Sequence, residues 1–330
     1  MIGTLDIALD SGGHRPVWRA TVKQASNPVV WLVGRPADEA AMLIPRVFNL
    51  CASAHAEAAR RALGLPPGPD ADASARQERL RDHAVAVFCD WPVLLGGAAD
   101  REALKGLAGG LPDTMRALRR HLLGDETDLV GGGVRTLERW LSQGATPTAR
   151  LLARLHGLLD PAWGRAELPV PEPADIVASL ETGRAPEPRE TTAADLWRGT
   201  PLFSELTARE GMSLFVRMLA RLIDLVACLD ATGALPGACP RVPAAGIGLV
   251  RAARGLLAHR ATVSAGVVTD YRVLSPSAWN LAEGGLLGRM LAALPLGDRN
   301  PMLARLVLTC VNPCVPVRLR AGAAEVMAHA

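Results

Sequence analysis

The chain has 330 residues, of which 49% are hydrophobic and 21% charged, and its formal net charge is +3. This length allows a substantial buried core, and the composition is typical of a globular protein rather than a disordered one. The positive charge is small and dispersed, so nucleic acid and anionic membranes are not expected as partners. The most apolar segment, residues 212–229, contains three charged residues and predicts a buried helix rather than a membrane span.

The six cysteines show no regular spacing, and the first residues contain no basic region followed by an apolar core. A reducing, cytoplasmic setting is therefore expected, with thiols free for metal or redox chemistry. The cysteines are Cys51, Cys89, Cys228, Cys239, Cys310 and Cys314.

The first elements are predicted to be strands. Alternating apolar residues at 5–9 and 18–22, with a short apolar run at 29–33, predict a small antiparallel sheet of about three strands. Pro36 and Asp38 then open a helix that ends near residue 49.

A second helix is expected from about Cys51 to Leu65, so that Cys51 and His55 share one face. The proline- and glycine-containing stretch at 66–73 predicts a surface loop. Helical periodicity follows at 74–89, 100–123, 134–143 and 147–159.

Prolines are dense between residues 164 and 190, which predicts exposed connections around one short helix at 174–181. A long amphipathic helix is predicted over 205–230, then a hairpin whose strands are 256–263 and 267–274. Two further helices are expected at 277–294 and 301–310 before the chain turns into Cys314. The sequence thus predicts a single, mainly helical (α+β) domain over residues 1–330.

Common catalytic and metal motifs are missing from the sequence: it has no Walker loop, C-x-x-C, H-E-x-x-H or G-x-S-x-G. Cys51 by itself is more often a buried apolar residue than a ligand, although a helix start favours the metal-binding thiolate. Cys314 follows Asn312 and Pro313 in a constrained loop, and His55 is most often a hydrogen-bonded core histidine. The residues alone leave a two-thiolate site as one hypothesis among several.

Four stretches follow one another along the chain: RVFNLCASAH at 46–55, RAARGLLAH at 251–259, YRVLSPSAWN at 271–280 and NPCVPV at 312–317. Taken together, they resemble the large subunit of nickel–iron hydrogenases. In the same order, that family has R-x-C-G-x-C-x-x-x-H near its start, then E-A-P-R-G-x-L-x-H and Y-Q-x-V-x-P-S-T-W-N, and D-P-C-x-x-C near its end. The resemblance covers both ends of the chain well and the middle poorly. It implies a large-subunit-like helical core with small antiparallel β-sheets.

The departures from the family pattern concern its metal ligands. The family holds nickel and iron with four cysteines, and the matching positions are Phe48, Cys51, Cys314 and Val317. Nickel would lack a full set of thiolates and is not expected to bind.

Two further departures concern proton transfer and processing. The family's N-terminal glutamate, which transfers protons, is matched by Ile2. The final histidine, after which the maturation protease cuts, is matched by Arg320 with ten residues after it. Proteolytic processing and hydrogen turnover are therefore not expected.

The part of the family site that surrounds iron is retained. In the family, an arginine and a serine contact the cyanides of the iron, and these positions hold Arg254 and Ser277. An Fe(II) with two cyanides and two thiolates has a formal charge near −2, which a buried arginine and a hydroxyl suit. Pro276 would add a dry wall beside a carbonyl ligand, and His55 belongs to the surrounding frame. Otherwise Arg254 would form a structural ion pair, and Ser277 would cap a helix.

This combination resembles the HupK/HoxV group, large-subunit paralogues that act in hydrogenase maturation. The resemblance implies a scaffold, not an enzyme, on which Cys51 and Cys314 transiently hold an Fe(CN)2(CO) unit. The implied partners are a HypC-like chaperone, a HypD-like iron–sulfur protein and the apo large subunit. Two thiolates rather than four would favour release of the unit.

Three alternatives stay open. The chain would be a cofactor-free interaction module that docks maturation chaperones if both cysteines were dispensable. A degenerate catalytic subunit would need an electron-transfer partner and a redox ligand set. A Cys51–Cys314 disulfide would form a redox switch if the two Cα atoms lay within about 7 Å. Cys310 is either an auxiliary thiol or a buried structural residue.

Overall fold

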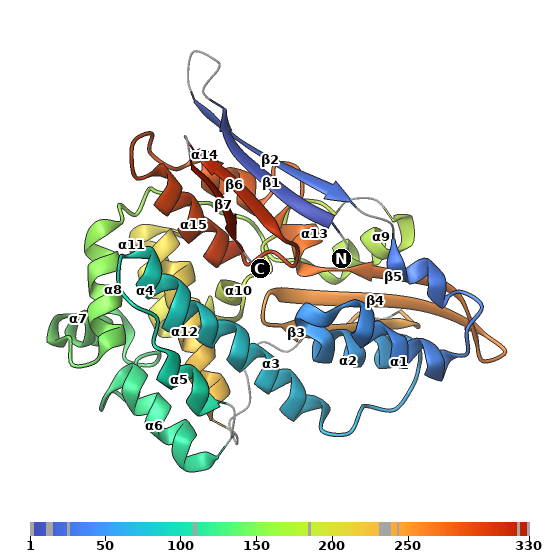
Figure 1. The fold of residues 1–330 in the computed structure, drawn as a ribbon. Coiled ribbons are helices and arrows are strands. Elements are labelled where there is room, and N and C mark those ends of the chain that lie inside the picture. The colour runs from blue at the N-terminus through green and yellow to red at the C-terminus, as the bar shows by residue number, and fades with distance from the viewer. Residues whose placement is uncertain are drawn as a thin grey trace.

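The computed structural model describes residues 3–10, 16–24, 27–107, 111–183, 186–230, 239–242, 244–321 and 324–328. Figure 1 shows a body of helices on the left, a three-stranded sheet with two helices on the right, and a four-stranded sheet above them. The helix α3 (Ala71–Val85) runs between the left and right parts.

The four-stranded sheet joins strands from both ends of the described chain. Its order is β2-β1-β6-β7, formed by β1 (Gly3–Asp10), β2 (Val17–Gln24), β6 (Val317–Ala321) and β7 (Ala324–Ala328). Strand β1 pairs antiparallel with β2 but parallel with β6, and Leu5 N donates to Pro316 O at 2.9 Å. The predicted antiparallel pairing is confirmed for β1 and β2, whereas the parallel pairing of β1 with β6 was not predicted.

The predicted third strand at 29–33 is instead a short 3₁₀ helix, η1 (Pro28–Leu32). Pro28 lies in its first turn, and Asn27 Oδ1 accepts a hydrogen bond from Val29 N at 3.3 Å. Val29 and Leu32 are buried. Their spacing of three matches the 3₁₀ period, which a short apolar run does not distinguish from a strand.

The second sheet consists of β3 (Ile247–Ala252), β4 (Gly255–Ser264) and β5 (Val267–Leu274), all antiparallel. The predicted hairpin is confirmed as β4 and β5, whereas β3 was not expected. Helices α1 (Ala37–Val47) and α2 (Ala52–Ala62) lie beside this sheet in Figure 1. At Gly248 the approach of α2 is so close that an added Cβ would lie 2.0 Å from Ala58 O.

Helix α9 (Pro173–Thr182) packs against the three-stranded sheet. The other helices are α4 (Trp91–Leu94), α5 (Arg101–Gly106), α6 (Pro112–Leu123), α7 (Gly133–Gln143), α8 (Pro147–Leu158), α10 (Ala193–Trp197), α11 (Pro201–Glu210), α12 (Leu214–Leu229), α13 (Pro276–Asn280), α14 (Leu286–Ala292) and α15 (Asn300–Val311). Among the described residues, no helix is long and apolar enough to cross a membrane.

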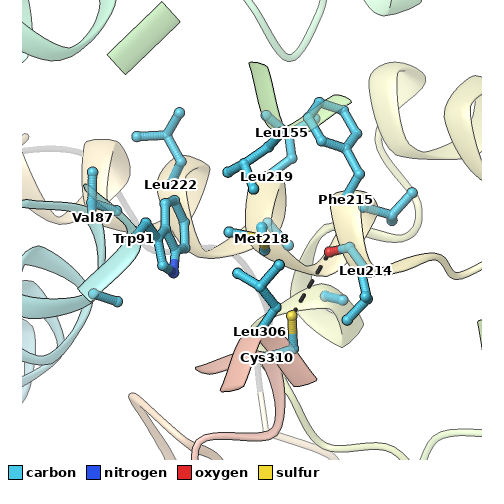
Figure 2. Close-up of a cluster of buried hydrophobic side chains, with 14 of the residues drawn as sticks. Val87, Trp91, Leu155, Leu214, Phe215, Met218, Leu219, Leu222, Leu306 and Cys310 are labelled. Atoms are coloured by element: carbon cyan, nitrogen blue, oxygen red, sulfur yellow. Dashed lines mark hydrogen bonds between the residues drawn. The ribbon is translucent and has the colours of Figure 1, made fainter. Parts of the chain in front are cut away.

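Helix α12 forms the centre of the main core. Figure 2 shows its side chains packed against Leu155 of α8, Trp91 of α4 and Leu306 of α15. Cys310 belongs to this cluster and donates a hydrogen bond from Sγ to Leu214 O at 3.7 Å, so its surroundings are those of a structural core residue.

Three predicted helices are each divided in two. The helix expected at 205–230 is α11 and α12, because Gly211 has a φ of 67° and Ser213 Oγ then accepts from Val216 N at 3.2 Å. The helices expected at 100–123 and 277–294 are α5 with α6 and α13 with α14.

The proline-dense stretch 164–190 is less exposed than expected. Helix α9 is confirmed within it, but Leu168 and Glu190 are buried. Glu190 N donates to Pro169 O at 2.9 Å, and the carboxylate forms an ion pair with Arg217 of α12. This segment is held inside because the buried Arg217 needs an anionic partner. The loop expected at 66–73 ends earlier, since α3 begins at Ala71.

Candidate functional site

Cys51 lies at the start of α2, in the short 3₁₀ turn η2 (Asn49–Cys51) that follows α1. Its side chain is buried, with 3% of the residue exposed. The free amides of Ser53 and Ala54 donate to the carboxylate of Glu78 on α3, at 2.7 and 3.2 Å. A residue from another helix thus supplies the cap for α2 and fixes the segment that contains Cys51.

Cys314 lies in the loop between α15 and β6. Asn312 ends α15 in the left-handed conformation, with a φ of 49°, and its Nδ2 donates to Asp82 Oδ2 at 2.6 Å. Cys314 N donates to Ser277 Oγ at 2.7 Å. The loop is therefore anchored to α3 on one side and to α13 on the other.

The structure brings Cys51 and Cys314 together as free thiols, close enough to hydrogen-bond each other. The hydrogen bond from Cys51 lowers the pKa of Cys314, and it outweighs burial with help from Arg254 and Ser277. The same hydrogen bond and burial raise the pKa of Cys51. The shared hydrogen bond and the charge of Arg254 therefore favour the thiolate form at Cys314 over that at Cys51.

Arg254 lies in the turn between β3 and β4, beside this pair. Its Nη2 contacts Asp82 Oδ1 at 3.3 Å, and Asp82 Oδ2 contacts Arg221 Nη2 at the same distance. The other terminal nitrogen, Nη1, is buried and has no hydrogen-bond partner among the described residues. An unpartnered buried guanidinium nitrogen is costly, and an anionic acceptor would satisfy it.

Ser277 and Pro276 lie in the first turn of α13, where both are buried. The suggestion that Ser277 caps this helix is wrong, because the cap is Ser275, whose Oγ accepts from Ala278 N at 3.2 Å. Ser277 Oγ is thus free to accept from the Cys314 amide and to donate to the Cys314 sulfur.

His55 is buried in a chain of rings beside the site. Its Nδ1 lies 2.8 Å from His259 Nε2, and His259 Nδ1 lies 2.7 Å from the Tyr271 hydroxyl. Burial lowers the pKa of His55 to about 3 and that of His259 well below its usual value, so both rings are neutral. Because its Nδ1 is engaged by His259, His55 belongs to the frame around Cys51 and does not offer this nitrogen as a ligand.

The positions that match the other family cysteines are apolar. Phe48 is buried and stacks on His55 with 4.1 Å between ring centroids, and Val317 is buried at the start of β6. Arg320 is exposed on β6, and Ile2 lies outside the described residues. Within the described ranges, no group of three or more His, Cys, Asp and Glu side chains could hold a metal.

A cleft of about 1180 Å³ opens beside the cysteine pair. Leu50 and Ala52, which flank Cys51, and Pro313, which precedes Cys314, form part of its wall. The other lining residues are Asn49, Ser53, Ala73, Ser74, Gln77, Glu78, Arg81, Asp82, Val85, Asp90, Leu94, Arg221, Arg254, Arg305, Leu308, Thr309, Asn312 and Val317. The cysteines thus lie just behind the wall of a wide opening.

Sequence reasoning missed Glu78 and Asp82, which join α3 to the two cysteine segments. The only signal was a pair of carboxylates four residues apart on a helix, and solvent-exposed helices show the same pattern.

Known proteins of similar sequence are hydrogenase expression/formation proteins. HupK of Rhodobacter capsulatus is 34% identical over 325 residues, which cover 97% of this chain and 98% of that protein. HoxV of Cupriavidus necator is 25% identical, and the match covers 86% and 88% of the two chains. A scan against protein-family models gave no match.

Solved structures of similar fold are hydrogenases. The Ni-Fe-Se hydrogenase from D. vulgaris Hildenborough matches with a TM-score of 0.60 and 16% identity, over 92% of this chain and 94% of that chain. An NAD+-reducing NiFe hydrogenase matches with a TM-score of 0.54 and 17% identity, over 93% and 94%. At these identities the likeness shows the fold alone, and it confirms the expected mainly helical, large-subunit-like architecture.

Proposed function

Because this chain belongs to the HupK family of hydrogenase expression/formation proteins, we propose that it is a maturation scaffold that transiently holds an Fe(CN)2(CO) unit on Cys51 and Cys314. The unit is cargo, which passes on to the apo large subunit. The observation that carries this proposal is the adjacent thiol pair of Cys51 and Cys314 with Arg254, which hydrogen-bonds Cys314 and whose buried Nη1 has no partner among the described residues.

Each residue has a separate part in holding the cargo. Cys51 and Cys314 are the two ligands, and both sulfurs bind the iron as thiolates. Arg254 Nη1 donates to one cyanide and offsets the negative charge of the unit, while the Ser277 hydroxyl turns its single proton from the Cys314 sulfur to the second cyanide. Pro276 contributes an apolar wall beside the carbonyl. Nickel is not expected to bind here, because Phe48 and Val317 supply no donor atoms to coordinate it.

The scaffold acts without catalytic turnover, in the cytoplasm. Its partners are a HypC-like chaperone with a HypD-like iron–sulfur protein, which deliver the unit, and the apo large subunit, which receives it. Because the protein supplies only two ligands, only two iron–sulfur bonds have to be exchanged at each transfer, which favours release of the unit.

Infrared spectroscopy tests the proposal. The wild-type protein and the variants Cys51→Ala and Cys314→Ala are purified without oxygen from cells that carry the maturation genes. Cyanide and carbonyl stretching bands are expected in the wild type and are lost in either variant. Cys89→Ala, which removes a half-buried thiol outside the site, keeps the bands.

Bands that persist in both site variants would overturn the assignment of the ligands. Bands absent from all four proteins, with chaperone binding unchanged, would instead favour the cofactor-free interaction module.

A further inference from the structure

The cleft beside the cysteine pair is long and follows one face of α3. Seven residues of this helix line it: Ala73, Ser74, Gln77, Glu78, Arg81, Asp82 and Val85. From residue 73 to residue 85 a helix rises by about 18 Å. An extended peptide of about five or six residues covers the same distance. At about 1180 Å³ the cleft is also larger than most small-ligand pockets, which have volumes of about 300–1,000 Å³.

The carboxylates that line the cleft only partly neutralise its arginines. Asp82 is shared by Arg221 and Arg254, and Glu78 is engaged by the first amides of α2. By contrast, Arg81 and Arg305 form no ion pair with any residue that the structure describes. Four arginines (Arg81, Arg221, Arg254 and Arg305) thus line the cleft against three carboxylates (Glu78, Asp82 and Asp90), and Asp90 interacts with Arg305. The lining therefore has an excess of one positive charge, which favours an occupant with an acidic group.

Apolar side chains accompany these arginines. Leu50 and Val85 line the cleft and are 43% and 45% exposed, although both are large hydrophobic residues. An occupant that covers them and reaches Arg81 and Arg305 must carry apolar and acidic groups along an extended backbone. A segment of a protein has this chemistry, whereas a free iron complex does not fill the length of the cleft.

The fold also limits which protein fits. The receiving large subunit has the same architecture as this chain, so its own cysteine segments are interior as well. Two interior sites on two folded bodies do not meet directly, and a slender segment has to bridge them. Given the function proposed above, on which this inference rests, we propose that the cleft receives an extended, acidic and apolar segment of the smaller carrier protein that exchanges the iron unit.

Binding measurements on the full-length chain test this. The probe is the purified HypC-like chaperone in complex with its iron–sulfur partner, and the readout is the dissociation constant by biolayer interferometry. Arg81→Glu, Arg305→Glu and Leu50→Asp are each expected to weaken binding tenfold or more. Arg154→Glu, on the exposed face of α8, serves as the matched control and leaves binding unchanged. Circular dichroism verifies that each variant is folded.

A photo-crosslinking residue at Ser74, which is exposed at one end of the cleft, identifies the occupant. A crosslink that maps to one short acidic and apolar segment of the carrier supports the inference. Crosslinks to a second copy of this chain, or binding by the three cleft variants as tight as that of Arg154→Glu, would overturn it.

The inference and the proposed function fail separately. Cys51→Ala and Cys314→Ala are expected to keep carrier binding while they lose the infrared bands. If the wild type never shows the bands but binds the carrier through Arg81 and Arg305, the iron scaffold is wrong and the docking cleft stands.

Discussion

Arg254 is held at one end of its guanidinium only. Its Nη2 contacts Asp82, while the buried Nη1 has no partner among the residues that the structure describes and, in the function proposed above, donates to the cargo. A lysine at this place would keep the charge but lose the planar fork, so that one ammonium would have to choose between Asp82 and the cyanide.

Replacing Arg254 by lysine is therefore expected to weaken the binding of the iron unit about tenfold, equal to about 1.4 kcal/mol, which lowers the iron content and shifts the remaining cyanide bands. Arg251→Lys is the control, because Arg251 lies close by in the same hairpin but pairs with Asp195. Iron analysis and infrared spectra of both variants decide the matter. An unchanged spectrum in Arg254→Lys would mean that the guanidinium does not touch the cargo.

Among individual residues, the sequence could predict those of the site that lie in recognisable motifs. Cys51, Cys314, Arg254 and Ser277 each stand in a short pattern that can be read locally. Glu78 could not be found in this way, because its role depends on α3 crossing the start of α2, a contact between residues 25 positions apart. Nothing in its own neighbourhood distinguishes it from a solvated carboxylate.

The contact between α2 and β3 sets the position of Cys51 at the scale of whole elements. Gly248 permits this contact, because a Cβ there would lie 2.0 Å from Ala58 O and 2.7 Å from Ala62 N. Both of these neighbours are backbone atoms, which cannot relieve a steric clash by rotating as a flexible side chain does.

Gly248→Ala is expected to destabilise the protein by about 1–3 kcal/mol, since overpacking forces α2 away from the sheet. It should also reduce the iron content, because Cys51 moves with α2. Gly157→Ala is the control: this helical position has open space around it, and the change is neutral or slightly stabilising. Urea denaturation of both variants gives the free energies of unfolding, and equal values would contradict the close packing.

Element boundaries were the least predictable part of the fold. Residues 205–230 have a continuous helical period, and only Gly211 and the Ser213 cap reveal the break between α11 and α12. Strand β6 was not expected because its pairing with β1 depends on the complete fold and not on its own short pattern. Tertiary pairing decides such elements, whereas the hairpin of β4 and β5 is local and was found.

For the molecule as a whole, the site rests on a buried ionic network. Asp224 of α12 contacts Arg79 and His83 of α3, with His83 Nε2 at 2.8 Å. Arg221, one turn earlier on α12, contacts Asp82 and so connects this network to Arg254. Burial alone would raise the pKa of Asp224, but the hydrogen bond from His83 and the charge of Arg79 hold it well below its usual value.

Stability should therefore fall in acid. A carboxyl group whose pKa is lower in the folded state stabilises that state at pH values above its unfolded pKa, near 3.9. This contribution decreases as the pH falls below about 4, through the lower folded value. Urea midpoints between pH 7 and pH 3 are expected to drop at the acid end.

Asp224→Asn should cost about 3–5 kcal/mol at pH 7, because it leaves buried charge unpaired, and should flatten this pH dependence. Asp113→Asn, on an exposed pair with Arg116, should change stability by less than about 0.5 kcal/mol. An Asp224→Asn variant as stable as Asp113→Asn would show that the network contributes little.

Because β6 pairs with β1, the loop with Cys314 can be positioned only after β6 has been synthesised. The segment with Cys51 leaves the ribosome early, but Cys314 reaches it only when the strand that follows is made and can lie beside β1. An incomplete chain therefore presents one thiol and no partner for it. If the proposed function holds, a chain that stops before β6 lacks the second thiolate ligand and is not expected to hold the iron unit.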